Sequence, residues 1–269
     1  MRQTFDETTE RAFGARHLPL IRQAMAEQKL DGFLVPHEDE HQNEYLPGAN
    51  DRLAWATGFT GSAGAAVILK DKAAVFVDGR YTLQVRDQVD ESLFEIRDLV
   101  EGGVPAYLES AAGKGQAIGY DPRLHSPDGL ARVRAAVEKA GAELKPVEQN
   151  PLDAAWGAKR PAQPQAPVLP HPLDYAGEES AAKRARIGKA LAAKGAEAAV
   201  ITAPASIAWL FNIRGGDVIR SPLPLAQAIL GADGRARLFL DPVKVSQELP
   251  AWLGNQVSLG APDALAGAL

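Results

Sequence analysis

The sequence predicts an α/β protein built from two domains, each a mixed β-sheet flanked by helices. Three observations lead to this prediction. Segments with helical and strand patterns alternate along the chain, the same order of segments occurs twice, and a proline-rich stretch separates the two occurrences. The chain has 269 residues and is 46% hydrophobic, which is enough for one large domain or two ordinary ones.

Prolines mark the expected boundary between the domains. The stretch 159–172 reads KRPAQPQAPVLPHP. Each proline fixes φ and removes an amide donor, so neither a helix nor an inner strand can run through this stretch. We therefore expect an extended, polyproline-like linker at 159–172, with a first domain at 1–158 and a second at 173–269.

The first domain begins with a helix. Pro19 has a fixed φ that suits a first helical position, and Asp31-Gly32 can end the helix. A strand at 33–35 follows, then a hairpin whose two apolar runs are joined by a charged turn. The remaining elements are expected in this order: hairpin strands 65–69 and 73–77, helix 80–88, strand 93–97, helix 104–112, strand 116–120, helix 127–140 and strand 143–147.

The second domain repeats the opening of the first. A helix is expected at 178–194, a strand at 198–202 and a hairpin at 225–230 and 236–240. An Ala-Trp pair precedes the hairpin in each half, and Asp78 and Asp241 follow the hairpins. This order predicts an internal duplication, although any two α/β domains share such alternation. If the halves are copies, the second is shorter than the first and therefore incomplete.

Composition excludes several classes of function. The net charge is −5 and there is no cysteine, so the chain has no electrostatic reason to bind nucleic acid or anionic lipid and can form no thiolate metal site. The N-terminus, MRQTFDETTER, lacks the apolar core of a signal peptide. No apolar run approaches the roughly 20 residues that span a bilayer. We expect a soluble cytoplasmic protein with neither nucleic acid nor membrane as partner.

The residues His37 to His41 match H-E-x-x-H, a zinc-binding pattern. That chemistry needs a helix, because only a helix places both imidazoles on one face. Here the pattern directly follows a strand and Pro36 in loop-like surroundings, and no third ligand can be assigned, so we expect no zinc site. The other histidines, at 17, 125 and 171, are expected to be surface or capping residues.

Glycine-rich segments offer two kinds of candidate. The segment 58–64, GFTGSAG, lacks the Lys-Ser/Thr of a phosphate-binding loop and leads into a strand, so a tight turn is expected. At 78–81 and 214–217, arginine and aspartate flank glycine. Glycine allows close backbone approach, and an arginine fork suits a carboxylate or carbonyl. The alternative is that each arginine pairs with its neighbouring aspartate to hold a turn.

Several stretches together resemble the three-domain Xaa-Pro aminopeptidases. They occur in order over nearly the whole chain, and the family often has Ser where Gly216 stands. The stretches are DEHQNEY at 39–45, GFTGSAG at 58–64, DGRYTLQ at 78–84, LDYAG at 173–177 and IAWLFNIRGGDV at 207–218.

The resemblance implies two N-terminal domains of creatinase type, followed by a C-terminal "pita-bread" domain that this sequence lacks. That domain would bind two divalent metals, usually manganese, through two Asp, one His and two Glu. It would remove the first residue of a peptide whose second residue is proline. None of these ligands has a counterpart here, so no catalytic or metal-binding residue is carried over. This chain would be an inactive accessory half that shapes substrate access and supports a homodimer.

Four residues are candidates for positions near the substrate: Arg80, Tyr45, Arg214 and Asp217. Arg80 follows the end of strand 73–77, a common place for ligand-facing groups, and related creatinases use a front-domain arginine to hold substrate. Two other interpretations stay open. One is a non-catalytic interaction module, like the aminopeptidase-like region of a histone-chaperone subunit. The other is a creatinase or prolidase, whose front half is usually one domain.

Overall fold

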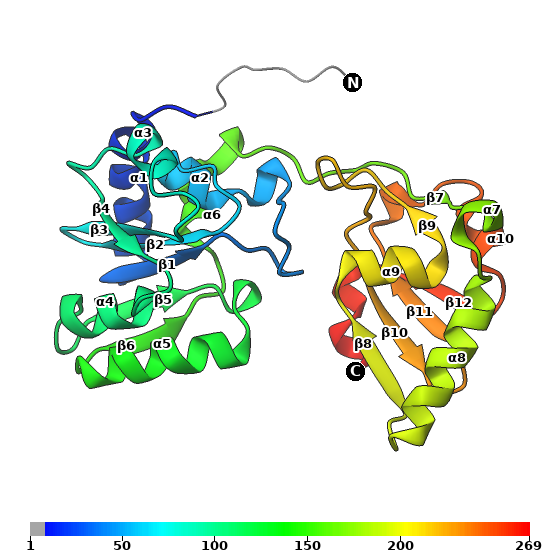
Figure 1. Cartoon of the computed structure of the whole chain (residues 1–269). Helices are drawn as coiled ribbons and strands as arrows, with labels where there is room; N and C mark the ends of the chain where they lie inside the picture. Colours follow the sequence, from blue (N-terminus) through cyan, green and yellow to red (C-terminus); the bar gives the residue numbers. More distant parts are fainter. Residues whose placement is uncertain (1–8) are drawn as a thin grey trace. The chain divides into compact units, whose positions relative to one another are not determined.

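The computed structural model describes residues 9–269 and divides into two compact units (Figure 1). The first unit holds residues 9–44 and 48–161, and the second is built mainly from 162–269. Both contain a β-sheet flanked by helices, which confirms the predicted α/β class. Most of the charged N-terminal segment considered above lies outside the described residues. No described helix has the length and apolar character that a membrane crossing demands.

The first unit is a six-stranded sheet in the order β4-β3-β2-β1-β5-β6. Strand β2 is antiparallel to both of its neighbours, and the other adjacent pairs are parallel. The sheet therefore grows from β1 to β4 in one direction, and the chain then returns to add β5 and β6 on the other side of β1. The elements are α1 (Phe13–Glu27), β1 (Gly32–Pro36), α2 (Arg52–Thr57), β2 (Gly64–Leu69), β3 (Ala73–Val77), α3 (Gln84–Gln88), β4 (Glu95–Asp98), α4 (Gly103–Ala111), β5 (Ala117–Tyr120), α5 (Pro127–Lys139), β6 (Glu143–Pro146) and α6 (Pro151–Trp156).

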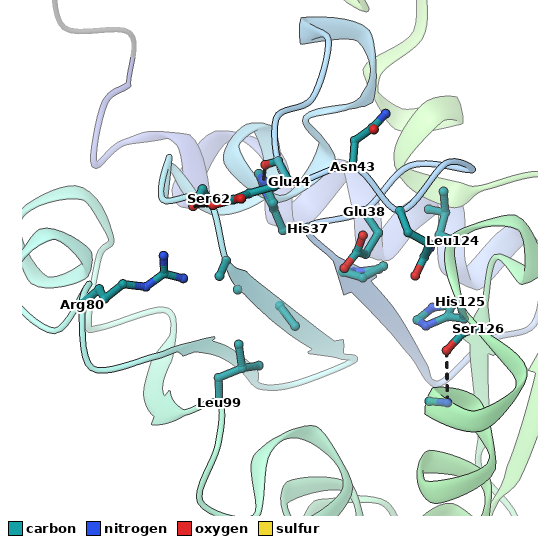
Figure 2. Close-up of a pocket in the computed structure, with 16 residues that line it drawn as sticks. His37, Glu38, Asn43, Glu44, Ser62, Arg80, Leu99, Leu124, His125 and Ser126 are labelled. Carbon is teal, nitrogen blue, oxygen red and sulfur yellow. Dashed lines mark hydrogen bonds between the residues drawn. The ribbon is translucent and has the colours of Figure 1, made fainter. Parts of the chain in front are cut away.

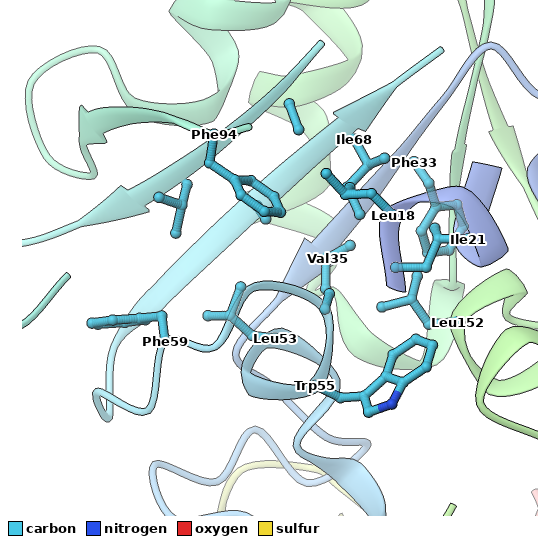
Figure 3. Close-up of a cluster of buried hydrophobic side chains, with 14 of the residues drawn as sticks. Leu18, Ile21, Phe33, Val35, Leu53, Trp55, Phe59, Ile68, Phe94 and Leu152 are labelled. Carbon is cyan, nitrogen blue, oxygen red and sulfur yellow. The ribbon is translucent and has the colours of Figure 1, made fainter. Parts of the chain in front are cut away.

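Helices cover both faces of this sheet, with α1, α2 and α6 on one face and α4 and α5 on the other (Figure 1). Successive strand residues point to opposite faces, so the apolar residues of β1 serve two cores. Phe33 and Val35 belong to the core beneath α1, α2 and α6 (Figure 3). Leu34, between them, packs in the core that includes Tyr107 and Leu108 of α4.

Both predicted boundaries of the first helix are wrong. Pro19 lies inside α1, where the missing N–H costs one helical hydrogen bond that burial of the apolar face offsets. The helix ends before Asp31-Gly32, because Lys29 adopts a φ of +57° and Leu30 N–H donates to Met25 O over 2.9 Å. This left-handed ending needs no glycine, and Gly32 is left to begin β1.

The second unit has a four-stranded sheet in the order β12-β11-β10-β8 and a two-stranded pair β7-β9. Strands β8, β10, β11 and β12 repeat the pairing directions of β1, β2, β3 and β4. This recurrence is what the predicted internal duplication requires. The elements are β7 (Leu169–Pro170), α7 (Leu173–Ala176), α8 (Ser180–Ala193), β8 (Ala198–Ile201), α9 (Pro204–Phe211), β9 (Ile213–Arg214), β10 (Gln227–Gly231), β11 (Ala236–Phe239), α10 (Leu249–Leu253) and β12 (Val257–Gly260).

The proline-rich stretch is extended and contains no α-helix. Its last part joins the second unit, because Leu169 pairs with Arg214 and Val168 N–H donates to Lys244 O over 2.8 Å. Proline is tolerated in such a short edge strand, because the strand does not need the N–H donor that proline lacks. The boundaries at 158 and 173 stay predictions. Short 3₁₀ turns lie at Gly48–Asn50, Pro122–Leu124, Gly157–Lys159, Pro242–Lys244, Pro262–Ala264 and Ala266–Ala268.

Candidate functional site

The carboxyl ends of β1 and β5 border a cleft of about 660 Å³ in the first unit (Figure 2). These two strands are adjacent and parallel, and the order of the sheet reverses between them. Open α/β sheets commonly bind ligands at such a reversal. The cleft is lined by residues after β1, at the start of β2, near the ends of β3 and β4, and before α5.

Asp39 shapes the loop that follows β1. Its carboxylate is buried and accepts hydrogen bonds from His41 N–H over 2.9 Å and from Asn43 Nδ2 over 2.9 Å. The backbone between β1 and Gly48 forms turns and bends without a helix, so His37 and His41 do not share a helical face. The predicted loop is confirmed. Within residues 9–269, no group of three or more His, Asp or Glu side chains is arranged to hold a metal ion.

Glu38 reaches the cleft from the end of β1. Its carboxyl is half-buried, and no described residue forms a hydrogen bond with it. Burial, and after it the charge of Asp39, raises the pKa of Glu38 from its ordinary value of 4.5 to about 7. Near neutral pH this carboxyl therefore exists in both protonation states.

The raised pKa of Glu38 predicts a pH dependence of stability. The folded pKa lies above the unfolded one, so the stabilising contribution is complete below pH 4.5 and is lost as the pH rises through about 7. Because the group is only half-buried, solvent screening limits the loss to about 1–2 kcal/mol. In urea denaturation at about pH 4.5 and about pH 8, the wild type and the exposed control Glu40→Gln should show this loss relative to Glu38→Gln, because the buried histidines contribute equally to the pH dependence of all three proteins. Glu38→Gln should remove it, and an unchanged pH dependence in that variant would contradict the assignment.

His125 lines the cleft from the segment directly before α5. Its Nε2 atom is buried and has no hydrogen-bond partner among the described residues. Burial lowers the pKa of His125 below its ordinary value, and the charge of Asp121 offsets part of this effect. The ring is therefore neutral near pH 7. His125 occupies the C-cap position of the 3₁₀ turn Pro122–Leu124, in keeping with the capping role expected for it, and it also lines the cleft.

Two other histidines pack against aromatic rings. His17 stacks on Trp55 with ring centroids 4.3 Å apart, and burial lowers the pKa of His17. His171 stacks on Tyr175 with centroids 5.8 Å apart. His37 lines the cleft, and its Nε2 lies 3.0 Å from Glu44 O.

Arg80 lines the cleft from the turn after β3. Its guanidinium already pairs with Asp78, with Nη2 2.7 Å and Nε 3.1 Å from the carboxylate oxygens. These hydrogen bonds, with the Arg80 N–H that also donates to Asp78, hold the pKa of Asp78 below its usual range. Residues 80–83 belong to this turn, so only the second part of the helix predicted at 80–88 is helical, as α3 (Gln84–Gln88). The structure thus contains the turn-stabilising pair and also places the guanidinium in the cleft lining.

The other three candidates, Tyr45, Arg214 and Asp217, belong to the second unit and are not among the residues that line the cleft. Tyr45 is exposed, one residue beyond Glu44 of the lining. Arg214 donates from Nη1 to Ile213 O over 2.8 Å, and Asp217 is buried against Lys244, whose Nζ lies 2.9 Å from its Oδ2. Arg214 and Asp217 therefore do not form the pair considered from sequence.

Sequence reasoning missed Glu38 and His125 as members of one site. One belongs to a misleading zinc pattern, and the other is an isolated histidine. A usable signal exists, because each residue follows a predicted strand closely. It becomes informative only when the two strands are known to be adjacent and parallel.

Two family models, both described as Creatinase/Prolidase N-terminal domain, match residues 18–153 and 159–269. The chain is 36% identical over 248 residues to a probable Xaa-Pro aminopeptidase P of Blastomyces gilchristii, covering 91% of this chain and 40% of that protein. A probable Xaa-Pro aminopeptidase P of Aspergillus niger is 37% identical over 254 residues, or 93% of this chain and 41% of that protein.

A solved structure is also similar. The X-prolyl aminopeptidase from Caenorhabditis elegans, described as a cytosolic enzyme with a di-nuclear active site, has a TM-score of 0.87 and 25% identity. The similarity covers 95% of this chain and 44% of that one. The chain therefore spans about two fifths of the length of the curated relatives it matches.

Proposed function

Because this chain belongs to the creatinase/prolidase N-terminal domain family, we propose that it is the N-terminal accessory region of a metal-dependent Xaa-Pro aminopeptidase. The observation that carries the proposal is the similarity to the C. elegans enzyme, which extends over 95% of this chain. The curated relatives support the same activity, since both are probable Xaa-Pro aminopeptidases P.

The described residues do not fit a di-nuclear metal centre. No group of three or more His, Asp or Glu side chains within 9–269 is arranged to hold even one ion. In our proposal, the two divalent metals, manganese by preference, are held by a further domain, and this region contributes no metal ligand. The substrate is a peptide with proline at its second position. The region shapes access for that peptide and supports a homodimer in the cytoplasm.

Arg80 is the residue we propose for substrate contact. Its guanidinium is exposed, so solvent screening keeps the ion pair with Asp78 weak and the pair can yield to a ligand. Its fork suits a carboxylate or carbonyl of the peptide beyond the proline. A hydrogen bond from this fork to a charged group of the substrate would contribute about 1.5–3 kcal/mol to binding.

Replacing Arg80 with alanine in the full-length enzyme is therefore expected to lower kcat/KM for an Xaa-Pro peptide roughly ten- to a hundred-fold. Arg80→Lys should recover part of the loss, because it keeps the charge without the fork. Arg86→Ala is the matched control: Arg86 is also exposed and also forms a surface ion pair, with Glu91, but does not line the cleft.

Kinetics and melting temperature should be measured on the same samples. Unchanged kinetics with a lower melting temperature would make Arg80 a residue of the turn alone. A full-length wild-type protein that binds no metal and cleaves no Xaa-Pro peptide would overturn the proposed activity. That outcome would favour the non-catalytic interaction module.

A further inference from the structure

We propose that Glu38 and His125, in the cleft whose lining also includes Arg80, bind a primary ammonium group. The proposal concerns residues of this chain alone and does not depend on peptidase activity. Figure 2 shows the Glu38 carboxyl and the His125 ring on the same side of the cleft. They come from the ends of adjacent parallel strands, and both line the cleft.

Neither the Glu38 carboxyl nor Nε2 of His125 has a hydrogen-bond partner among residues 9–269. The Glu38 carboxyl accepts no hydrogen bond from a described residue, although its neighbour Asp39 accepts three. Nε2 of His125 is buried without a partner. Buried polar atoms are rarely left unsatisfied in proteins, because they lose their hydrogen bonds to water without gaining others. A ligand that donates hydrogen bonds to both groups would satisfy the buried Nε2 of His125 and would also engage the half-buried Glu38 carboxyl.

The charge around the cleft favours a cation. Glu38 and Glu44 both line it, and the carboxylate of Glu44 accepts from Ser62 Oγ through Oε1 over 3.0 Å. Arg80 is the cationic residue of the lining, but its charge is matched by Asp78. The amino end of α5 disfavours a cation, but its cap is occupied, since Ser126 Oγ accepts from Gly129 N–H over 3.2 Å.

An ammonium group suits these acceptors better than other cations do. Its N–H donors diverge, so one can reach the Glu38 carboxylate and another the lone pair of a neutral His125 ring. A guanidinium fork prefers both oxygens of one carboxylate. A metal ion would need further ligands, and the described residues supply no group of three. The volume of about 660 Å³ leaves room for the molecule that carries the ammonium.

The ammonium can come from a free peptide amino terminus or from a lysine side chain, and three probes separate these sources. Glycinamide carries the first, Nα-acetyl-lysine amide carries the second, and N-acetylglycinamide carries neither. Each is titrated into the ¹⁵N-labelled chain at about pH 7.5, and amide shifts are followed by NMR. We expect saturable shifts near residues 37–44 and 124–129 with at least one of the first two probes and none with the third.

Variants then assign the contacts. Glu38→Gln should weaken binding roughly tenfold, and His125→Phe should weaken it several-fold. Glu40→Gln, an exposed carboxylate two residues from Glu38 and outside the lining, should bind like the wild type. In each variant, the resonances of residues outside the cleft should match those of the wild type, which would confirm that the variant folds. Equal shifts with all three probes, no shifts with any, or unchanged affinity in folded Glu38→Gln would overturn the proposal. None of these outcomes bears on the proposed peptidase, which is tested on the full-length enzyme.

Discussion

Replacing Asp217 with alanine is expected to destabilise the second unit by about 3–5 kcal/mol, the typical cost of removing one partner from a buried ion pair. The side chain of Asp217 is 0% exposed and that of Lys244 is 7% exposed. Asp217 Oδ2 accepts from Lys244 Nζ over 2.9 Å and from Leu225 N–H over 2.6 Å. Without the carboxylate, an ammonium and a backbone donor would stay buried without a partner.

Urea denaturation followed by tryptophan fluorescence can test this, since Trp209 and Trp252 report on the second unit. The exposed Asp263→Ala is the matched control and should change stability by less than about 0.5 kcal/mol. The double variant Asp217→Leu with Lys244→Met should recover most of the loss, because it leaves no buried charge. If Asp217→Ala unfolds like the control, the pair does not hold this unit together and Asp217 returns as a candidate for ligand binding.

Replacing Asp153 with alanine is expected to destabilise the first unit by about 2–4 kcal/mol. Its carboxylate binds Arg52 through two hydrogen bonds, of 2.7 Å to Nε and 2.9 Å to Nη2, and also pairs with Arg160 over 2.8 Å. The Arg52 side chain is only 7% exposed, so its charge would lose its partner inside the protein. The expected cost is lower than for Asp217 because the side chains of Asp153 and Arg160 retain some contact with water.

The measurement is again urea denaturation, with Trp55 and Trp156 as reporters of the first unit. Asp153→Asn should cost less than Asp153→Ala, because the amide oxygen still accepts one of the hydrogen bonds. The exposed Glu148→Ala is the matched control. Equal stability of the asparagine and alanine variants would show that the hydrogen bonds contribute little.

Local signals predicted the elements whose boundaries depend on adjacent residues. The strand Ala73–Val77 was predicted to the residue, because an apolar run lies between charged residues. The helix at Pro127 was placed correctly at its start, where Ser126 caps it. The start at Pro19 failed because the burial of α1 against the sheet outweighs the local preference of proline.

The sequence by itself therefore determined the α/β class, the repeated order of elements and the loop that excludes a zinc helix at His37. These follow from hydrophobic periodicity and turn residues, which act over a few positions. Only the tertiary structure decided the partners of Asp217 and Asp153, at separations of 27 and 101 residues, and the presence of Glu38 and His125 in the lining of one cleft. Such contacts depend on which strands become neighbours. That choice is made by the burial of whole faces, so no short stretch of sequence records it.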